Sequence, residues 1–233
     1  MATRLQWAGH STLRLESDGI TLLVDPFYTG NPSAEAAGLS ASDLDPTYIL
    51  VSHGHEDHLG DTVALALRCN ATVIANYEIS KWLQEQGLTR VHGMQHGGGI
   101  ALEGGLHVKL TLAFHGSTLP GGGYGGNPCG FVITLPDGRR IYDAADTALF
   151  GDMRLIGDKG LELAILPIGD YFTMGPDDAI DAIGLLRPKL VMPIHYNTFP
   201  PIAQDVEAWA KRVEAETSAK PVVPAPGEWI ELG

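Results

Sequence analysis

Short apolar runs alternate along the chain with segments of helical period, and turn residues separate them. Residues 106–112 alternate apolar and polar side chains with period two, which is typical of a half-buried strand. The same criteria predict strands within 5–15, 20–24, 47–51, 72–75, 101–114, 131–135, 139–142, 161–168, 189–194, 222–223 and 229–231, and helices at 61–68, 77–86, 176–186 and 205–214. Strands in two groups, each with helices, predict a layered α/β protein.

Two segments lack such a pattern and are predicted to be loops. Residues 28–46 are rich in turn residues, and residues 116–130 are dense in glycine. We expect the glycine-dense loop to act as a lid that presents Tyr124 or Asn127. Nothing in the 233 residues resembles a linker, so we expect one domain spanning 1–233.

The composition of the chain indicates which kinds of molecule it can bind. The net charge is −13 and basic residues are not clustered, which argues against nucleic acid and favours a small-molecule substrate. The two cysteines, Cys69 and Cys129, are expected to be free thiols in a reducing cytosol. No apolar stretch reaches the ~18 residues of a membrane span, and the first residues do not resemble a signal peptide. We therefore expect a cytoplasmic protein without membrane association, and self-association into a homo-oligomer is left open.

The most informative segment follows the predicted strand at 47–51. Residues 53–61 hold three imidazoles and three carboxylates in nine positions. Burying such groups unpaired costs several kcal/mol each, whereas divalent metal uses imidazole nitrogen and carboxylate oxygen as ligands. The H-x-H-x-D-H spacing of His53, His55, Asp57 and His58 is therefore interpreted as half of a two-metal site.

The spacing also suggests how this segment divides between two ions. His53 and His55 lie two apart, so in an extended chain both side chains leave the same side and reach one metal. Gly54 lets the backbone bend close to that ion. Asp57 and His58 are adjacent and diverge, which suits a second ion. A helix should follow, capped by Asp61 or an earlier residue.

Two ions need more ligands than one loop supplies, and these are expected at strand ends. His115 follows the strand that ends near Phe114, and His195 ends the apolar run 189–194. Asp146 lies just past the strand at 139–142. On spacing alone Asp143 is an equal alternative to Asp146.

These segments together resemble the metallo-β-lactamase superfamily. More narrowly, the chain is similar to small prokaryotic metal-dependent hydrolases close to the ascorbate-phosphate lactonase branch. The resemblance rests on Gly9-His10-Ser11, Leu23-Val24-Asp25-Pro26-Phe27, residues 53–61, His115, Asp146-Thr147-Ala148 and Pro193-Ile194-His195-Tyr196.

The resemblance implies a four-layer αββα sandwich with mixed sheets and the site at one edge. It assigns His53, His55 and His115 to one metal. It assigns Asp57, His58 and His195 to the second metal, with Asp146 bridging the two. Of these, Asp57, Asp146 and His195 are the candidate catalytic residues. It favours Asp146 over Asp143.

Five further residues are candidates for supporting the ligands or touching substrate. Asp25 matches a buried aspartate of the superfamily, although a turn residue before Pro26 explains it as well on spacing. His10 is expected at the pocket rim, as ligand support or substrate contact, or else in a structural role. Asp170 follows a buried strand and faces either the site or a local turn. Tyr196 and Asn197 follow a ligand and could donate to a developing oxyanion.

The function hypothesis is a metal-dependent hydrolase of a small, anionic ester, either a lactone or a phosphodiester. Two divalent ions, two aspartates and a hydroxide that both metals activate leave about one positive charge facing the pocket. Zinc suits the imidazole-rich shell best, and manganese, nickel or iron remain open. The alternative is a non-catalytic, metal-dependent protein that binds or senses a small ligand on the same fold. A nuclease would need a basic face, and a serine hydrolase would need a G-x-S-x-G motif; the sequence has neither.

Overall fold

The computed structural model describes residues 3–232 and contains two seven-stranded sheets. The first has the order β14-β1-β2-β3-β4-β5-β6 and the second the order β13-β12-β11-β10-β9-β8-β7. The first sheet consists of β1 (Arg4–Trp7), β2 (Leu13–Ser17), β3 (Ile20–Val24), β4 (Tyr48–Leu50), β5 (Thr72–Asn76), β6 (Val91–Met94) and β14 (Trp229–Glu231). The second consists of β7 (Gly99–Ala101), β8 (His107–Leu112), β9 (Cys129–Thr134), β10 (Arg140–Asp143), β11 (Leu163–Pro167), β12 (Leu190–Ile194) and β13 (Lys220–Pro221).

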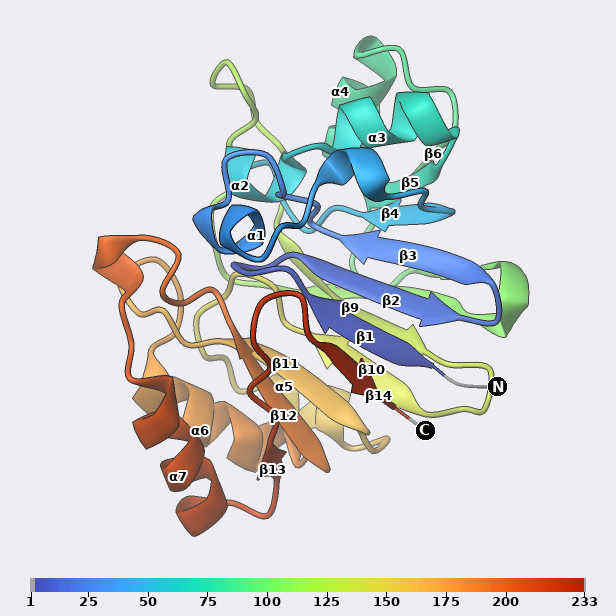
Figure 1. Cartoon of the computed structure of the whole chain (residues 1–233). Helices are drawn as coiled ribbons and strands as arrows, with labels where there is room; N and C mark the ends of the chain where they lie inside the picture. Colours follow the sequence, from blue (N-terminus) through green and yellow to red (C-terminus); the bar gives the residue numbers. More distant parts are fainter. Residues whose placement is uncertain (1–2, 233) are drawn as a thin grey trace.

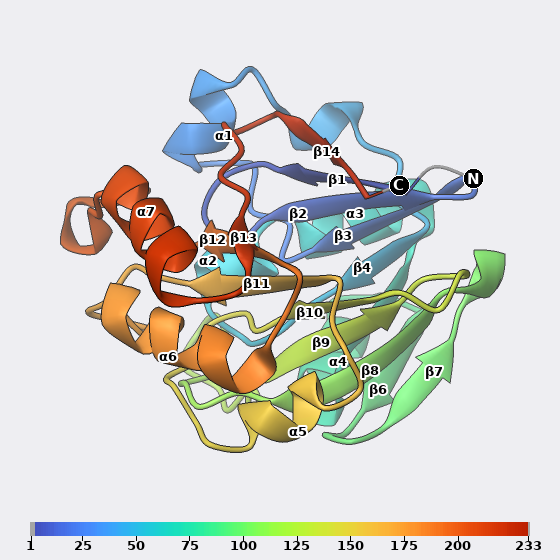
Figure 2. The ribbon, with the colours of Figure 1, turned by 90° about the horizontal axis from the view of Figure 1, so that it is seen from below.

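Helices cover the outer face of each sheet (Figure 1). The helices are α1 (Pro32–Ala36), α2 (Glu56–Leu59), α3 (Thr62–Cys69), α4 (Tyr77–Glu85), α5 (Met153–Gly157), α6 (Pro176–Leu186) and α7 (Val206–Glu216). Figure 2 shows the sheets stacked on one another, with α5 and α6 beyond the second sheet and α1 beyond the first. The expected αββα sandwich with mixed sheets is confirmed. None of the helices in residues 3–232 is long and apolar enough to cross a membrane.

The two cores follow from the alternation of side chains along the strands. On β3, Leu22 and Val24 are buried between the two sheets, whereas Leu23 is buried under the helices of the first sheet. On β4, Leu50 and Ile49 divide in the same way. Because each central strand is covered on both faces, it reads as a continuous apolar run in the sequence.

The topology brings the carboxyl ends of several strands to one edge. β1 and β3 both pair antiparallel with β2, and β3 and β4 pair parallel, so these three strands end on the same side. In the second sheet β8 and β10 both pair antiparallel with β9, and β10, β11 and β12 pair parallel. The strands β8, β10 and β12 therefore also run in one direction. Two backbone hydrogen bonds join the sheets at this edge, from His195 N–H to the His10 carbonyl (2.9 Å) and from Cys129 N–H to the Ser52 carbonyl (3.0 Å).

Several predicted elements need correction. The segment 5–15 is not one strand, because Gly9 and His10 take positive φ values of 99° and 54° and turn the chain between β1 and β2. The loop predicted at 28–46 contains α1, whose first turn Asn31 caps by accepting from Ser33 N–H, and a short 3₁₀ turn. The strand predicted at 222–223 lies two residues earlier, as β13.

The remaining differences concern caps and short elements. Asp61 stands at the N-cap of α3 without a side-chain cap bond, because its carboxylate accepts from Tyr28 N–H (2.9 Å) and Thr29 N–H (3.0 Å) instead. The pattern did not predict β6, α2 or α5. Cys69 and Cys129 are free thiols, as expected.

Candidate metal centre

The structure gathers the polar residues that follow these strand ends. His10 follows β1 and Asp25 follows β3, while the H-x-H-x-D-H segment follows β4 and runs into α2. From the second sheet, His115 follows β8, Asp146 follows β10 and His195 follows β12. All seven side chains expected to bind metal therefore lie at one edge of the sandwich.

The first cluster consists of His53, His55 and His115, whose ligating nitrogens lie within 4.8 Å of one another. His53 Nε2 lies 2.9 Å from His55 Nδ1. Burial, together with neighbouring imidazoles, lowers the pKa of all three rings below the ordinary value of 6.5. The rings are therefore neutral near pH 7, which is the form that binds metal.

The second cluster consists of His10, Asp57, His58 and His195. One candidate ligand atom from each of these residues lies within 4.8 Å of the others. Asp57 Oδ2 lies 3.1 Å from His10 Nε2. Burial by itself raises the pKa of Asp57, but the hydrogen bond to His10 and the nearby His58 outweigh it and hold the pKa well below its usual range. Asp57 is therefore an anion throughout the neutral range.

Asp146 lies between the two clusters. Its Oδ2 is 3.0 Å from His195 Nε2, 3.3 Å from His58 Nε2 and 3.6 Å from His115 Nε2. Burial alone raises the pKa of Asp146, but His195 and His58 beside it hold the pKa well below the ordinary 3.8. One carboxylate oxygen thus faces rings from both clusters, which is the arrangement of a bridging ligand.

Asp25 orients His58 from behind. Its Oδ2 accepts from His58 Nδ1 (2.7 Å) and its Oδ1 accepts from Ser52 N–H (2.8 Å). Because Nδ1 is committed to Asp25, the other ring nitrogen faces the cluster. The Asp25 backbone has a φ of +44°, a strained value held by this network.

The donor set fits divalent metal. His58 Nε2 is buried and has no hydrogen-bond partner among residues 3–232, although Asp146 is close. Burial by itself lowers the pKa of His58, but Asp146 and Asp25 outweigh it and raise the pKa well above 6.5. A cation at Nε2 would take the place of the proton that Asp146 attracts there, and it would satisfy the orphaned atom.

His10 does not lie at the pocket rim. The sequence predicts His10 at the pocket rim or in a structural role, and in the structure it is fully buried, with Nδ1 3.0 Å from Thr198 Oγ1. Burial, only partly offset by Asp57, lowers its pKa to about 4, so the ring is neutral. The ring centroids of His10 and His195 are 4.1 Å apart. His10 therefore lies inside the second cluster and positions Asp57.

Three other candidates for supporting the ligands or touching substrate have their polar atoms away from the two histidine clusters. Tyr196 is buried and stacks on Trp7 with a centroid distance of 5.2 Å. The Asn197 side chain accepts from Gln204 N–H at 2.7 Å, so it stabilises its own loop. Asp170 is exposed and accepts from Tyr171 N–H at 2.9 Å. None of the three carries its polar atoms into the imidazole clusters.

The glycine-dense loop contacts the metal-ligand segment through the Ser117 side chain. Ser117 Oγ accepts from Gly54 N–H at 3.0 Å and donates to the Gly125 carbonyl at 2.9 Å. The Tyr124 side chain is 70% exposed and its hydroxyl donates to Asn127 Oδ1 at 3.2 Å. The two side chains proposed for a lid thus pair with each other.

Asp143, the alternative bridge, is buried and accepts from Ala145 N–H at 3.0 Å, and it belongs to neither of the two clusters. Burial is the main cause that raises its pKa from 3.8 to about 7. Between these values the folded chain holds a proton that the unfolded chain has released. The contribution of protonated Asp143 to the free energy of unfolding is therefore complete below pH 3.8, and it is lost as the pH rises through 7.

This shift predicts a pH dependence that Asp143→Asn removes. From pH 5 to pH 8 the parent should lose roughly 2–3 kcal/mol of unfolding free energy relative to the variant. Urea unfolding of both proteins with chelator present measures the difference. Parallel pH profiles for the two proteins would contradict the assignment.

Comparison with known proteins shows the family of the chain. The model of the beta-lactamase superfamily domain matches residues 4–195. The chain belongs to the metallo-β-lactamase superfamily.

Within the superfamily, two similar relatives are both named UPF0173 metal-dependent hydrolase. The one from Pelotomaculum thermopropionicum is 47% identical, over 98% of this chain and 100% of that protein. The one from Thermus thermophilus is 48% identical, over 98% of each. The structure of Igni18, a metallo hydrolase from Ignicoccus hospitalis, superposes with a TM-score of 0.90 at 34% identity, covering 99% of this chain and 98% of that one.

Proposed function

We propose that this metal-dependent hydrolase cleaves a small, anionic ester, either a lactone or a phosphodiester, at two divalent ions. The observation that carries the proposal is the position of Asp146, whose single oxygen Oδ2 lies within 3.6 Å of rings from both histidine clusters. A site for one ion does not require ligands on both sides of one carboxylate.

The two clusters divide the ligands. His53, His55 and His115 would hold the first ion and Asp57, His58 and His195 the second, with Asp146 as the ligand that both would share. Zinc suits this imidazole-rich shell, and manganese, iron or nickel accept the same donors. When bound, such ions polarise the scissile group and lower the pKa of coordinated water toward about 7.

The protein's own residues supply positioning and proton transfer. Asp57 is the ligand of the second cluster that is partly exposed, with 34% of its side chain accessible. Because its low pKa keeps it ionised, the Asp57 carboxylate can accept a hydrogen bond from the attacking water and orient it; so weak a base would relay a proton to the leaving group without retaining it. His10 holds the Asp57 carboxylate in place while this happens.

Metal removal and reloading tests the proposal. We expect the protein as purified to hydrolyse members of a panel of lactones and phosphodiesters. Chelation should reduce the rate to background, and one of zinc, manganese, iron or nickel should restore it. Tight metal and ligand binding without turnover of any substrate in the panel would instead favour a binding or sensing protein.

A further inference from the structure

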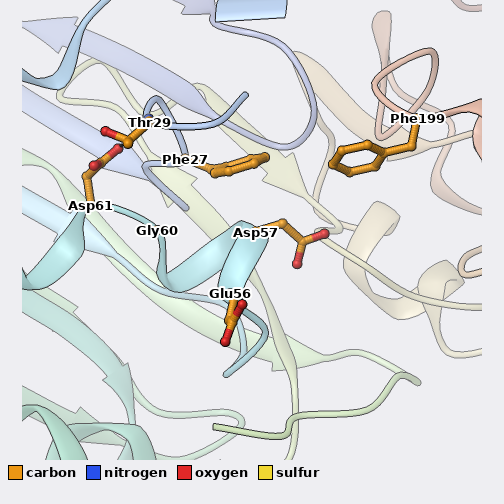
Figure 3. A pocket seen from close by; sticks show the side chains of 7 residues that line it. All are labelled: Phe27, Thr29, Glu56, Asp57, Gly60, Asp61 and Phe199. Carbon is orange, nitrogen blue, oxygen red and sulfur yellow. Dashed lines mark hydrogen bonds between the residues drawn. The ribbon is translucent and has the colours of Figure 1, made fainter. Parts of the chain in front are cut away.

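A cavity of about 570 Å³ opens beside Asp57. Its size suits a small organic molecule. Figure 3 shows its lining, in which the phenyl rings of Phe27 and Phe199 point toward each other and the Asp57 carboxylate lies beneath them. We refer to Phe27 and Phe199 as the aromatic wall. Because Asp57 both belongs to the second cluster and lines this cavity, a group that projects from the second cluster past Asp57 would enter it.

Both rings of the aromatic wall are held by the structure around them. The Phe27 ring meets the buried His10 ring edge-on at a centroid distance of 5.9 Å, and the Phe199 ring does so at 5.6 Å. The backbone of Phe27 is fixed on both sides, since its N–H donates to the Asp25 carbonyl (2.8 Å) and its carbonyl accepts from Asn31 Nδ2 (2.9 Å). Phe199 begins a 3₁₀ turn at Pro200–Ile202. Such a preformed surface loses little entropy when it binds a ligand.

Gly60 allows the acidic side of the cavity to approach this wall. Its φ is +40°, and a Cβ at this position would lie 2.3 Å from the Pro26 carbonyl oxygen and 2.9 Å from Phe27 Cα. Any larger residue would separate the end of α2 from the segment that carries Phe27. The close approach places Asp57 and the aromatic wall around one space.

The charges of the lining exclude an anionic tail. The described residues that line the cavity include Glu56, Asp57 and Asp61 but neither lysine nor arginine. The Asp61 carboxylate is occupied by Tyr28 and Thr29 N–H groups, and the Asp57 carboxylate is paired with His10. A second anionic group on the substrate would meet like charges here without a cationic partner.

We propose that the cavity binds the part of the substrate that projects from the metal centre, and that this part is an uncharged, flat apolar group lying against the aromatic wall. The inference rests on the proposed function, because it takes the reacting group to sit at the metal ligands. It restricts that function: any negative charge of the substrate lies near the metal ligands and not on the part that enters the cavity. The substrates are therefore esters that carry an aryl group or a similarly flat apolar group, and not multiply charged sugar phosphates.

Phosphonates that bind without reacting test this inference independently of turnover. Calorimetry of the Zn²⁺-loaded protein compares methylphosphonate, phenylphosphonate and 4-carboxyphenylphosphonate, which present the same anion to the metals. We expect the phenyl compound to bind at least about tenfold more tightly than each of the others. A preference for phenyl over methyl below twofold, or tighter binding of the carboxyphenyl compound, would overturn the proposal, as would a failure of all three to bind.

Variants connect the preference to the aromatic wall. Phe27→Ala and Phe199→Ala should each lower the phenyl-to-methyl preference by about fivefold. Phe27→Leu and Phe199→Leu keep an apolar side chain and should give intermediate values. Phe172→Ala is the matched control, because Phe172 is 53% exposed and lies outside the cavity lining. A preference that survives both alanine substitutions would contradict the role of the wall.

Phosphonate binding and ester hydrolysis, measured on the same proteins, distinguish a failure of the proposed function from a failure of the cavity assignment. If phenylphosphonate is preferred but the lactones and phosphodiesters are not hydrolysed, the proposed function fails and the cavity assignment stands. If esters are hydrolysed while the phosphonates show no preference, the cavity assignment alone fails.

Discussion

Asp146→Ala is expected to abolish hydrolysis in a protein that remains folded. The Asp146 carboxylate faces His58, His115 and His195 through one oxygen atom, so its loss removes the ligand that we propose both ions share. We expect kcat/KM to fall at least about 1,000-fold, equivalent to about 4 kcal/mol of transition-state stabilisation. Steady-state kinetics on a substrate from the panel measures the loss, and circular dichroism checks the fold.

Asp143→Asn is the matched control for Asp146→Ala. Both aspartates are buried and lie three residues apart, but the Asp143 carboxylate accepts from Ala145 N–H instead of facing the rings. Its kcat/KM should stay within about fivefold of the parent value. Asp146→Asn, which keeps the side-chain shape, should lose most of the activity. Equal losses for Asp143→Asn and Asp146→Ala would contradict the placement of the bridge.

Gly169→Ala is expected to damage both stability and the metal centre. A Cβ on Gly169 would lie 2.1 Å from the His195 carbonyl oxygen and 3.2 Å from His195 Nδ1. Since the nearest atom belongs to backbone, the strand end that carries His195 must move. We expect a loss of about 3 kcal/mol in unfolding free energy, the upper part of the range for overpacking. The metal content should fall as well, because His195 belongs to the second cluster.

Gly184→Ala provides the comparison at a position with open space. Gly184 lies in α6, and a Cβ there would meet nothing within 4 Å. Alanine should stabilise the helix by about 0.5–1 kcal/mol and leave the metal content unchanged. Urea unfolding and elemental analysis of both variants give the result. A Gly169→Ala protein as stable and as rich in metal as the parent would show that the close contact is not restrictive.

The parts of the fold that could be predicted are those with strong local signals. α6 begins at Pro176 and ends at Leu186, as its proline, first-turn aspartates and apolar period indicate. β6 gave no such signal: it is short, partly exposed and interrupted by Gly93, where a Cβ would lie 2.2 Å from Ser80 Oγ. That glycine serves the packing of α4 on the strand, which is a tertiary constraint. α2 and α5, of four and five residues, are too short for a period to be visible.

The candidate site also has residues that the sequence could predict and residues that it could not. The seven proposed ligands could be found because they follow apolar strands and match a known motif. The burial of His10 could not, since it depends on how β1 and β12 meet across the two sheets. Phe27 and Phe199 lie far apart in the sequence, and only the fold brings both rings to one cavity and against His10. Tyr196 follows a ligand directly, yet it packs on Trp7.

Metal content per chain tests the central claim most directly. The protein is saturated with Zn²⁺ or Mn²⁺, freed of unbound ions and analysed for metal. We predict about two ions per chain for the parent and about one for His55→Ala, because His55 belongs to the first cluster only. A parent protein that binds one ion or none in excess of both metals would contradict a centre built from two clusters around Asp146.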